Sequence, residues 1–498
     1  MNNFQSDLDR VSESQKVCDN IKDFIEQALK KEEFKSMVSQ ISSCLDIPES
    51  VIKLKIKKLF NSKNDYKKGK FKIRSSYFGI ISNYCISIIL LIINVIPKPK
   101  QKNKSFDLII DDINELEQAS RFYKIVSKLN SSLMIVRPHL KVKGKKSIFK
   151  KIKNKNLNKI RNNFFLKSKV NISSNFNVVK LLNKYLILSL KNKIDFSFYL
   201  RVIITSYLRY SSIFETNKAK YLIQDRFFET CSIKNYLFKK KGGRFSCCTQ
   251  IHLVESTLGL FSDIDVFFSF GKETDSLNKF NKLGGRVAKS IPVGSHKMEQ
   301  LWHSKNKDLK KKEDIDILII GINPTSNPTS WFNITDEMRV NLLEFLKWIK
   351  KISIQNPKYN IIYKHHPNFP ENSILDNEEN EILKNSYVKK IIKSSNMEIN
   401  TYDYMNRSKI ILSYGSSMIL EGISEKKNCF FVSPHKNTSV FFNDLQYLNK
   451  IIIKNYDDLK KKIKLVLEDN KNVELFNDEI CLNSQNVSDK IVKFLNTP

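Results

Sequence analysis

Polar side chains follow two short apolar stretches in the second half of the chain. Residues 360–367 read Asn-Ile-Ile-Tyr-Lys-His-His-Pro, so an apolar strand runs directly into His366 and Pro367. Residues 409–421 read Lys-Ile-Ile-Leu-Ser-Tyr-Gly-Ser-Ser-Met-Ile-Leu-Glu and repeat this design, with a helix expected to follow. In an open α/β sheet, ligands bind at the carboxyl ends of the strands. We therefore expect the two strand tips to meet over one ligand.

The residue types at these tips suit a nucleotide. Gly415, Ser416 and Ser417 stand where a helix should start, so free backbone N–H groups and the positive end of the helix dipole can face a phosphate. Glu421, one turn into that helix, can accept hydrogen bonds from ribose hydroxyls, and His366 can donate to a phosphate or a leaving group. The simpler interpretation is a pair of buried strands with serine N-caps. Because both strand tips occur, and in this order, we favour a nucleotide site over two purely structural strands.

Neighbouring residues complete the candidate site. Side chains alternate along a strand, so His365 is expected to point away from His366 and to pack. The candidate nucleotide-binding residues are Lys364, His366, Pro367, Ser413, Gly415, Ser416, Ser417 and Glu421.

Three strand tips in the first half also carry polar groups. Asp225 ends the expected strand 219–225, and Gln250 and His252 end the expected strand 245–252. Residues 265–270 form the next expected strand, and residues 283–295 read as a turn-rich tip. Asp225 and His252 are the candidate general bases, and the residues alone do not choose between them.

Length and charge set the class of protein. The chain has 498 residues, enough for two or three domains, and its net charge of +34 suits nucleic acid, an anionic membrane or acidic substrates. Residues 141–169 hold 12 Lys or Arg and no acid, interleaved with apolar residues on an expected helix, which suits a membrane interface or a solvated basic loop. No nucleic-acid-binding motif is present, so nucleic acid is not an expected partner. The eight cysteines form neither a disulfide framework nor a zinc site.

Residues 77–97 form the most apolar window of the chain. The window has no charged residue and is flanked by lysines on both sides. Its 21 residues match the roughly 20 that span a bilayer. Asn83, Asn94 and two serines leave open a membrane span, an anchor lying in the membrane plane, and a buried core helix.

Alternating strands and helices predict an α/β fold with two Rossmann-like domains and an α-helical N-terminal extension. The expected order begins with a helix-rich segment and ends with closing helices. The predicted limits are 1–75 for the helical N-terminal region, 76–104 for the apolar segment and basic linker, 105–299 for the first domain, 300–313 for a linker, 314–465 for the second domain and 466–498 for the closing helices.

The order of these motifs resembles GT-B glycosyltransferases of bacterial surface-polysaccharide synthesis. Lys364-x-His366-Pro367 followed by Ser416-Ser417-x3-Glu421 is similar to the His-Pro and Ser-rich elements of capsule Kdo transferases, CDP-glycerol glycerophosphotransferases and bacterial sialyltransferases. Asp225, Gln250-Ile-His252, Asp265 and residues 293–295 look like the first domain of such proteins. Lys-His-His-Pro replaces the usual Lys-Pro-His-Pro, and an isoleucine interrupts the usual Gln-His-Gly.

The resemblance implies two Rossmann-like domains facing each other across a cleft. The second would bind a CMP-, CDP- or UDP-linked sugar, with His366 on the phosphate, Ser416 and Ser417 alongside and Glu421 on the ribose. The first would bind a glycan or lipid-linked acceptor, with Asp225 or His252 as the base. No metal and no cofactor are implied. The expected location is the cytoplasm, at the inner face of the cell membrane, with an anionic membrane surface as a further partner.

Two other functions fit parts of the sequence. A nucleotide-sugar epimerase would keep the two-domain design but needs several acids and histidines converging in the cleft, and acids are sparse at the expected tips. A nucleic-acid or polyanion binding protein would use the net charge of +34, and its affinity should fall steeply with salt.

Overall fold

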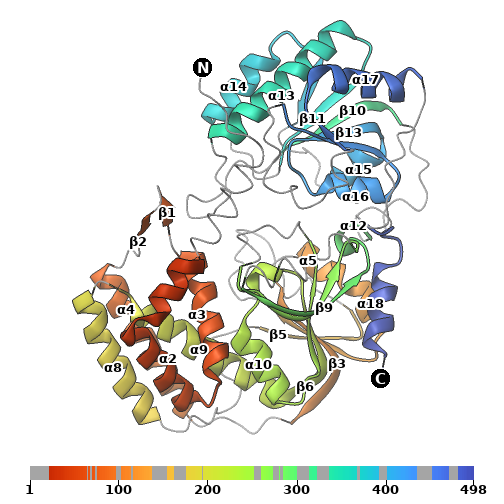
Figure 1. The fold of residues 1–498 in the computed structure, drawn as a ribbon. Coiled ribbons are helices and arrows are strands. Elements are labelled where there is room, and N and C mark those ends of the chain that lie inside the picture. The colour runs from red at the N-terminus through yellow and green to blue at the C-terminus, as the bar shows by residue number, and fades with distance from the viewer. Residues whose placement is uncertain are drawn as a thin grey trace.

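Two parallel sheets, one in each half of the chain, organise the molecule (Figure 1). This is a computed structural model. It describes residues 22–63, 65–67, 70–72, 76–96, 102–113, 116–136, 154–161, 175–192, 194–251, 260–272, 280, 284–299, 313–321, 336–366, 371–391, 401–434, 451–469 and 481–497.

The first sheet has seven parallel strands in the order β5-β4-β3-β6-β7-β8-β9. The strands are β3 (Lys104–Ile113), β4 (Ser132–Val136), β5 (Leu157–Arg161), β6 (Asn217–Gln224), β7 (Phe245–Thr249), β8 (Asp263–Ser269) and β9 (Arg286–Pro292). Helices α5 (Leu116–Arg121), α6 (Tyr123–Val126) and α10 (Ser232–Lys240) connect them. When β3 to β8 are numbered 1 to 6 along the chain, their order in the sheet is the 3-2-1-4-5-6 order of a Rossmann fold. Ligands are therefore expected at the carboxyl ends of β3 and β6, between which the strand order reverses.

The second sheet has six parallel strands in the order β12-β11-β10-β13-β14-β15, which is again 3-2-1-4-5-6. The strands are β10 (Ile315–Ile320), β11 (Ile361–Lys364), β12 (Val388–Ile391), β13 (Ser408–Ser413), β14 (Asn428–Val432) and β15 (Ile452–Ile453). The helices are α13 (Asp336–Gln355), α14 (Ile374–Leu383), α15 (Thr401–Asn406), α16 (Met418–Ser424) and α17 (Tyr456–Leu467). Apolar runs such as Ile317–Ile320 are buried because helices cover both faces of a parallel sheet.

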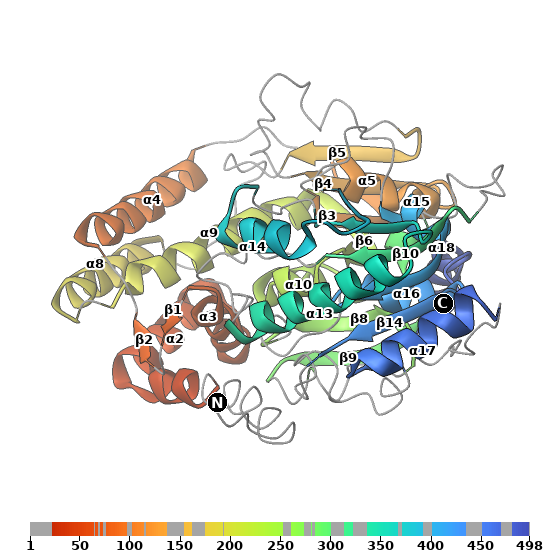
Figure 2. The same ribbon diagram turned by 90° about the horizontal axis from the view of Figure 1, so that it is seen from above.

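A helical unit extends the first domain. It contains α2 (Glu32–Leu45), α3 (Glu49–Lys63), α4 (Tyr77–Val95), α8 (Asn175–Asn192) and α9 (Phe196–Thr216). Phe34, Phe60 and Tyr199 meet at its centre, with ring centroids 4.9–5.8 Å apart. Both views place α4 and α8 side by side at the outer end of this unit (Figures 1 and 2).

The last helix, α18 (Val487–Leu495), returns to the first domain. Val487, Ile491 and Leu495 belong to the apolar core beneath β3 and β4, and Asp489 forms an ion pair with Lys128. Figure 1 shows this blue helix beside the first sheet. The chain therefore passes between the domains twice, once after β9 and once before α18.

The predicted fold class is confirmed: the protein is α/β, with two Rossmann-like domains and a helical N-terminal extension. Three local predictions are wrong. Residues 157–161 form the edge strand β5 where a basic helix was expected, and residues 286–292 form β9 where turns were expected. In the helical N-terminal region, β1 (Asp65–Lys67) and β2 (Lys70–Lys72) pair as an antiparallel hairpin.

Candidate functional site

The second sheet's switch point lies between β10 and β13, and Ser413 closes it. The Ser413 hydroxyl donates to the Ile320 carbonyl at 2.7 Å, so it ties the tips of the two strands together. The same oxygen accepts the backbone N–H groups of Gly415 at 3.3 Å and Ser416 at 3.1 Å. These two N–H groups were expected to be free for a phosphate, and that expectation is wrong because the turn uses both. Ser413 shapes the loop and has no spare donor for a ligand.

The remaining serines of this loop precede α16. Ser416 and Ser417 are half-buried, and the Ser416 hydroxyl accepts the Met418 N–H at 3.3 Å. No capping hydrogen bond involves the Ser417 side chain. The two hydroxyl protons are donors that this loop can offer to a phosphate.

Of the two histidines that follow β11, His365 packs as predicted. His365 is buried, with its ring centroid 4.2 Å from that of Tyr363 and its Nε2 3.2 Å from Glu379 Oε2. Burial lowers the pKa of His365 to about 3. His366 is half-buried, and the charges of Lys297 and Lys364 act on it. Its role on a ligand stays a prediction.

His366 is a neutral imidazole at pH 7. Burial and, to a smaller extent, the nearby charges of Lys297 and Lys364 lower its pKa to about 4. Lys364 is itself buried, donates to the His365 carbonyl at 3.0 Å and has a pKa lowered by burial. A neutral imidazole still carries one N–H donor, so His366 can bind an oxyanion without contributing a full positive charge. Pro367 lies outside the described residues.

Glu421 joins the two domains. It is fully buried one turn into α16; one oxygen accepts a hydrogen bond from Tyr402 OH at 2.8 Å and the other from Ser295 Oγ. Ser295 follows β9 and starts α12 (His296–Met298), where its hydroxyl also caps the Met298 N–H at 3.1 Å. Burial raises the pKa of Glu421, and the charge of Lys297 opposes that rise. The carboxylate does accept hydrogen bonds from two hydroxyl groups, as expected for a ribose, but both hydroxyls belong to the protein. A ribose hydroxyl would have to replace one of them.

Lys297 is the site residue that sequence reasoning missed. Its ammonium lies 6.0 Å from the centre of the Tyr402 ring, and its charge acts on both His366 and Glu421. It comes from α12, beyond the last strand of the first sheet, and reaches the tips of the second sheet. Lysine is common throughout this chain, so no sequence pattern distinguishes Lys297.

At the first sheet's carboxyl edge, Asp225 is held in a buried ion pair. Arg121 Nη1 on α5 lies 2.6 Å from one Asp225 oxygen, and Thr249 Oγ1 donates to the other at 3.2 Å. The charge of Arg121 also lowers the pKa of Glu421, which brings this pair close to the contact between the domains. The base role of Asp225 stays a prediction, and it would require Arg121 or Thr249 to move. His252 lies outside the described residues.

The first sheet's own switch point is filled by protein groups. Lys234 Nζ lies 2.6 Å from Asp111 Oδ2 at the end of β3 and also donates to Gln224 at the end of β6. Tyr210 OH donates to Asp111 at 3.3 Å, and Lys234 and Asp111 are both buried. The crevice between β3 and β6 is therefore closed by a salt bridge rather than shaped for a nucleotide.

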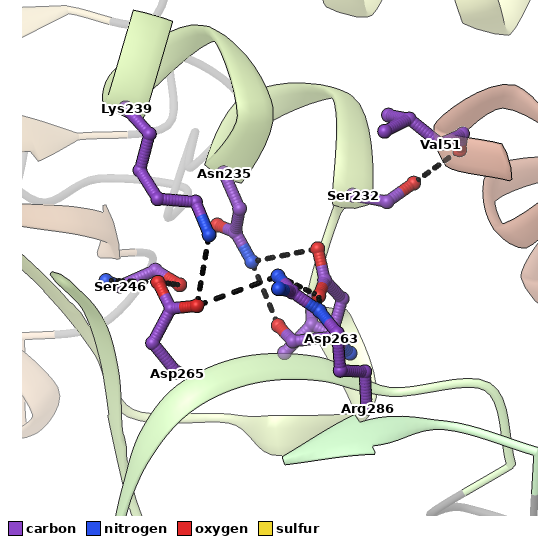
Figure 3. Close-up of polar contacts among 9 residues, drawn as sticks. Val51, Ser232, Asn235, Lys239, Ser246, Asp263, Asp265 and Arg286 are labelled. Atoms are coloured by element: carbon purple, nitrogen blue, oxygen red, sulfur yellow. Dashed lines mark hydrogen bonds and ion pairs between the residues drawn. The ribbon is translucent and has the colours of Figure 1, made fainter. Parts of the chain in front are cut away.

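A second charged cluster of the first domain lies at the opposite edge of the sheet, near the amino ends of β7, β8 and β9 (Figure 3). Arg286 Nη2 lies 2.6 Å from Asp263, and Lys239 Nζ lies 2.9 Å from Asp265. Asp265 also accepts the Ser246 N–H at 2.9 Å, and these bonds lower its pKa although burial acts to raise it. Because ligands bind at the carboxyl edge, this cluster stabilises the sheet and Asp265 is not a site residue.

Within the described residues, no group of three or more His, Cys, Asp or Glu side chains is placed to hold a metal ion. The Asp314-x-Asp316 pair begins β10, at the edge away from the site, and Asp316 pairs there with Lys409 at 2.9 Å. The side chains that gather between the sheets are instead three cations (Arg121, Lys297 and Lys364), two carboxylates (Asp225 and Glu421), the neutral imidazole of His366 and hydroxyl groups. Arg121 is paired with Asp225, so Lys297, Lys364, His366 and the hydroxyls are the groups that suit an anionic ligand.

No family model and no curated protein matches the chain, whereas solved structures do. UDP-GlcNAc 2-epimerase from Neisseria meningitidis bound to UDP-GlcNAc is 12% identical, covering 78% of this chain and 98% of its own, with a TM-score of 0.47. The wall teichoic acid polymerase TagF with CDPG is 12% identical, covering 84% and 96%, with a TM-score of 0.44. Acinetobacter baumannii MurG is 9% identical, covering 79% and 99%, with a TM-score of 0.35. The fold assignment therefore rests on the strand order of the two sheets.

Proposed function

We propose that this protein is a glycosyltransferase that moves a sugar or polyol phosphate from a nucleotide-activated donor to a surface-polysaccharide or lipid-linked acceptor. The observation that carries the proposal is the position of Lys297. This cation reaches from the first domain toward His366 and Glu421, which follow strands on either side of the second sheet's switch point. A phosphate bound at that switch point would meet donors from both domains.

The chemistry follows from these groups. When a nucleoside phosphate leaves a sugar, negative charge develops on its oxygens, and fixed donors stabilise that charge. Lys297 would supply the positive charge, and His366 and the hydroxyls of Ser416 and Ser417 would supply directed hydrogen bonds. These groups do the work of a metal ion, so the transfer is proposed to be metal-independent. Nucleotide-activated donors are made in the cytoplasm, which is where we place the reaction.

Donor binding would also rearrange the contact between the domains. For Glu421 to hold a ribose, either Tyr402 or Ser295 must give up its hydrogen bond to the carboxylate, and loss of the Ser295 bond would loosen the contact that now joins α16 to α12. The acceptor would approach from the first sheet, where Asp225 or His252 would take its hydroxyl proton.

The first experiment is thermal unfolding with CMP, CDP or UDP, because a ligand that binds only the native state raises the melting temperature. Transfer is then assayed with a panel of nucleotide sugars for wild type and His366→Ala, with Lys289→Ala as a control on the exposed side of β9. The proposal expects one nucleotide to stabilise the protein and His366→Ala to lose most of the transfer. Full activity of His366→Ala would remove His366 from the mechanism.

An epimerase of the same two-domain design is the second candidate. Such an enzyme moves a proton on the sugar and needs acids free to exchange it. Of the acidic side chains that the structure describes at the tips of β3 and β6, Asp111 and Asp225 are each held in a buried ion pair. This favours transfer over epimerisation. Product analysis with donor alone separates the two, since only an epimerase changes the sugar without an acceptor.

A further inference from the structure

Helix α4 buries some apolar side chains, such as Leu90 and Leu91, but it also turns its polar side chains toward the rest of the helical unit and leaves many apolar ones exposed. Asn83 Nδ2 donates to Asp195 Oδ2 at 2.9 Å, and Tyr84 OH donates to Asn183 Oδ1 at 2.6 Å. Ser87 and Asn94 are buried against the rest of the helical unit. A surface helix of a water-soluble domain has the opposite pattern, with its apolar face toward the core.

The outward side of α4 is a continuous apolar stripe. Its residues recur every three or four positions, which places them on one face of the helix. They are Phe78, Ile81, Cys85, Ile89, Ile92 and Ile96, and Phe78 is 83% exposed. At 1.5 Å per residue the stripe is about 27 Å long. Of the described residues, those of α4 alone form a helix long and apolar enough to cross a membrane, with a mean hydropathy of 2.1 and only 28% of the window buried.

Helix α8 continues the pattern beside α4. Phe176 and Ile187 are exposed, and the Lys180 ammonium lies 4.4 Å from the centre of the Phe176 ring. The helix carries three lysines and no acid. Apolar side chains with lysines among them are typical of helices that lie in a membrane interface. Figures 1 and 2 both show α4 and α8 together at the end of the molecule away from the second sheet.

Charge identifies the partner. Between Asp65 and Asp107 the sequence holds nine Lys or Arg and no acid, so basic residues flank the stripe at both ends. Anionic lipid headgroups complement such a rim. A second copy of the chain would instead bring two strongly positive rims together. Crossing the bilayer would strip α4 from α8 and α9 and expose Asn83, Tyr84, Ser87 and Asn94 to lipid, at a cost that lying in the interface avoids.

We propose that the face formed by α4 and α8 docks on an anionic lipid bilayer, with α4 parallel to the membrane and the apolar stripe of α4 among the acyl chains. The two Rossmann-like domains remain in water, and the outer end of the helical unit contacts the membrane. This inference rests on the helical unit alone and not on the proposed transfer reaction.

Flotation of the full-length protein with vesicles tests it. Wild type should float with phosphatidylcholine vesicles that contain phosphatidylglycerol. A much smaller fraction should float with vesicles of phosphatidylcholine alone. Ile89→Asp/Ile92→Asp should weaken binding about tenfold or more, because both side chains are exposed on the stripe. The matched control is Ile354→Asp/Ile374→Asp, which adds the same charge at exposed isoleucines of α13 and α14 and should bind like wild type.

Cys85 gives a second measurement at the middle of the stripe. It is exposed, whereas the other described cysteines are buried or half-buried, so Cys18→Ser and Cys44→Ser leave it as the reactive thiol for a polarity-sensitive dye. The proposal expects a blue shift with anionic vesicles and quenching by spin-labelled acyl chains. It is overturned if the wild type stays with the aqueous phase and the dye is unchanged. It is also overturned if light scattering shows a dimer that Ile89→Asp/Ile92→Asp dissociates without vesicles.

Discussion

Ser295 donates a hydrogen bond to Glu421, and this one contact joins the end of the first sheet to the helix that follows β13. Tyr402 donates to the other carboxylate oxygen at 2.8 Å. All three side chains are buried, so water cannot replace either donor. The carboxylate of Glu421 is therefore a structural link between the domains in the absence of ligand, and the hydroxyl partners are the groups that a nucleotide would have to displace.

Removal of the Tyr402 hydroxyl tests how much the Glu421 carboxylate depends on its donor within the second domain. Tyr402→Phe keeps the packed ring but leaves one oxygen of a buried carboxylate without its donor, which costs about 1.5–3 kcal/mol of the free energy of unfolding. Chemical denaturation measures it. Tyr387→Phe, at an exposed tyrosine, should change the free energy by less than about 0.5 kcal/mol. Equal stabilities of the two variants would show that Glu421 does not depend on Tyr402.

Lys297 should control the titration of His366. The cation lowers the pKa of His366, which lies at about 4. Lys297→Met removes the charge, so the pKa of His366 should rise, while burial keeps it below the ordinary value of about 6.5. NMR titration of the histidine ring protons measures this directly. Lys289→Met, on the exposed side of β9, should leave the His366 titration unchanged, and a shift of equal size there would indicate a general charge effect.

His296 should weaken the fold in acid. It is buried with its ring centroid 5.1 Å from that of Phe122, and burial lowers its pKa to about 4. In the unfolded chain the pKa is about 6.5, so the unfolded state binds more protons between these values and stability falls as the pH drops through this window. The loss from this one group is about 2 kcal/mol at pH 5.

His296→Phe checks that assignment because it removes the titration and keeps a ring against Phe122. As the pH falls from 8 to 5, the free energy of unfolding should fall more for wild type than for the variant. Parallel curves over this range would mean that His296 is not the group responsible.

The strand tips were predictable because they depend on local pattern. Ile361–Lys364 and Ser408–Ser413 are apolar runs flanked by polar residues, and parallel sheets need such strands buried on both faces. The packing of His365 follows from strand geometry in the same way. Fold class and the neighbourhood of β11, β10 and β13 could thus be derived from the sequence.

Other features depend on contacts between distant segments, which no local pattern encodes. β5 is a strand because its backbone pairs with β4, although its sequence, Leu-Asn-Lys-Ile-Arg, lies in a basic block that suits a helix equally well. The partners of Glu421 are 19 and 126 residues away. Lys297 reaches the site only because the chain crosses between the domains just after β9. Each of these required the tertiary structure.

The buried pair of Arg121 and Asp225 yields the last prediction. Arg121→Met leaves the Asp225 carboxylate without its cation in a site that is 1% exposed. Removing one partner of such a pair costs about 3–5 kcal/mol, whereas replacing both can be nearly neutral, because the penalty comes from the uncompensated charge. We therefore expect Arg121→Met to be strongly destabilised and Arg121→Met/Asp225→Asn to recover most of that loss.

Urea denaturation of wild type, both single variants and the double variant completes the cycle. A control pair at the surface is Lys347 and Glu344 on α13, which are 60% and 32% exposed, and its coupling should stay below about 1 kcal/mol. Additive losses for Arg121 and Asp225 would contradict the pairing. A large coupling would instead establish that Asp225 is held by Arg121, so any role as a base must begin with the separation of these two side chains.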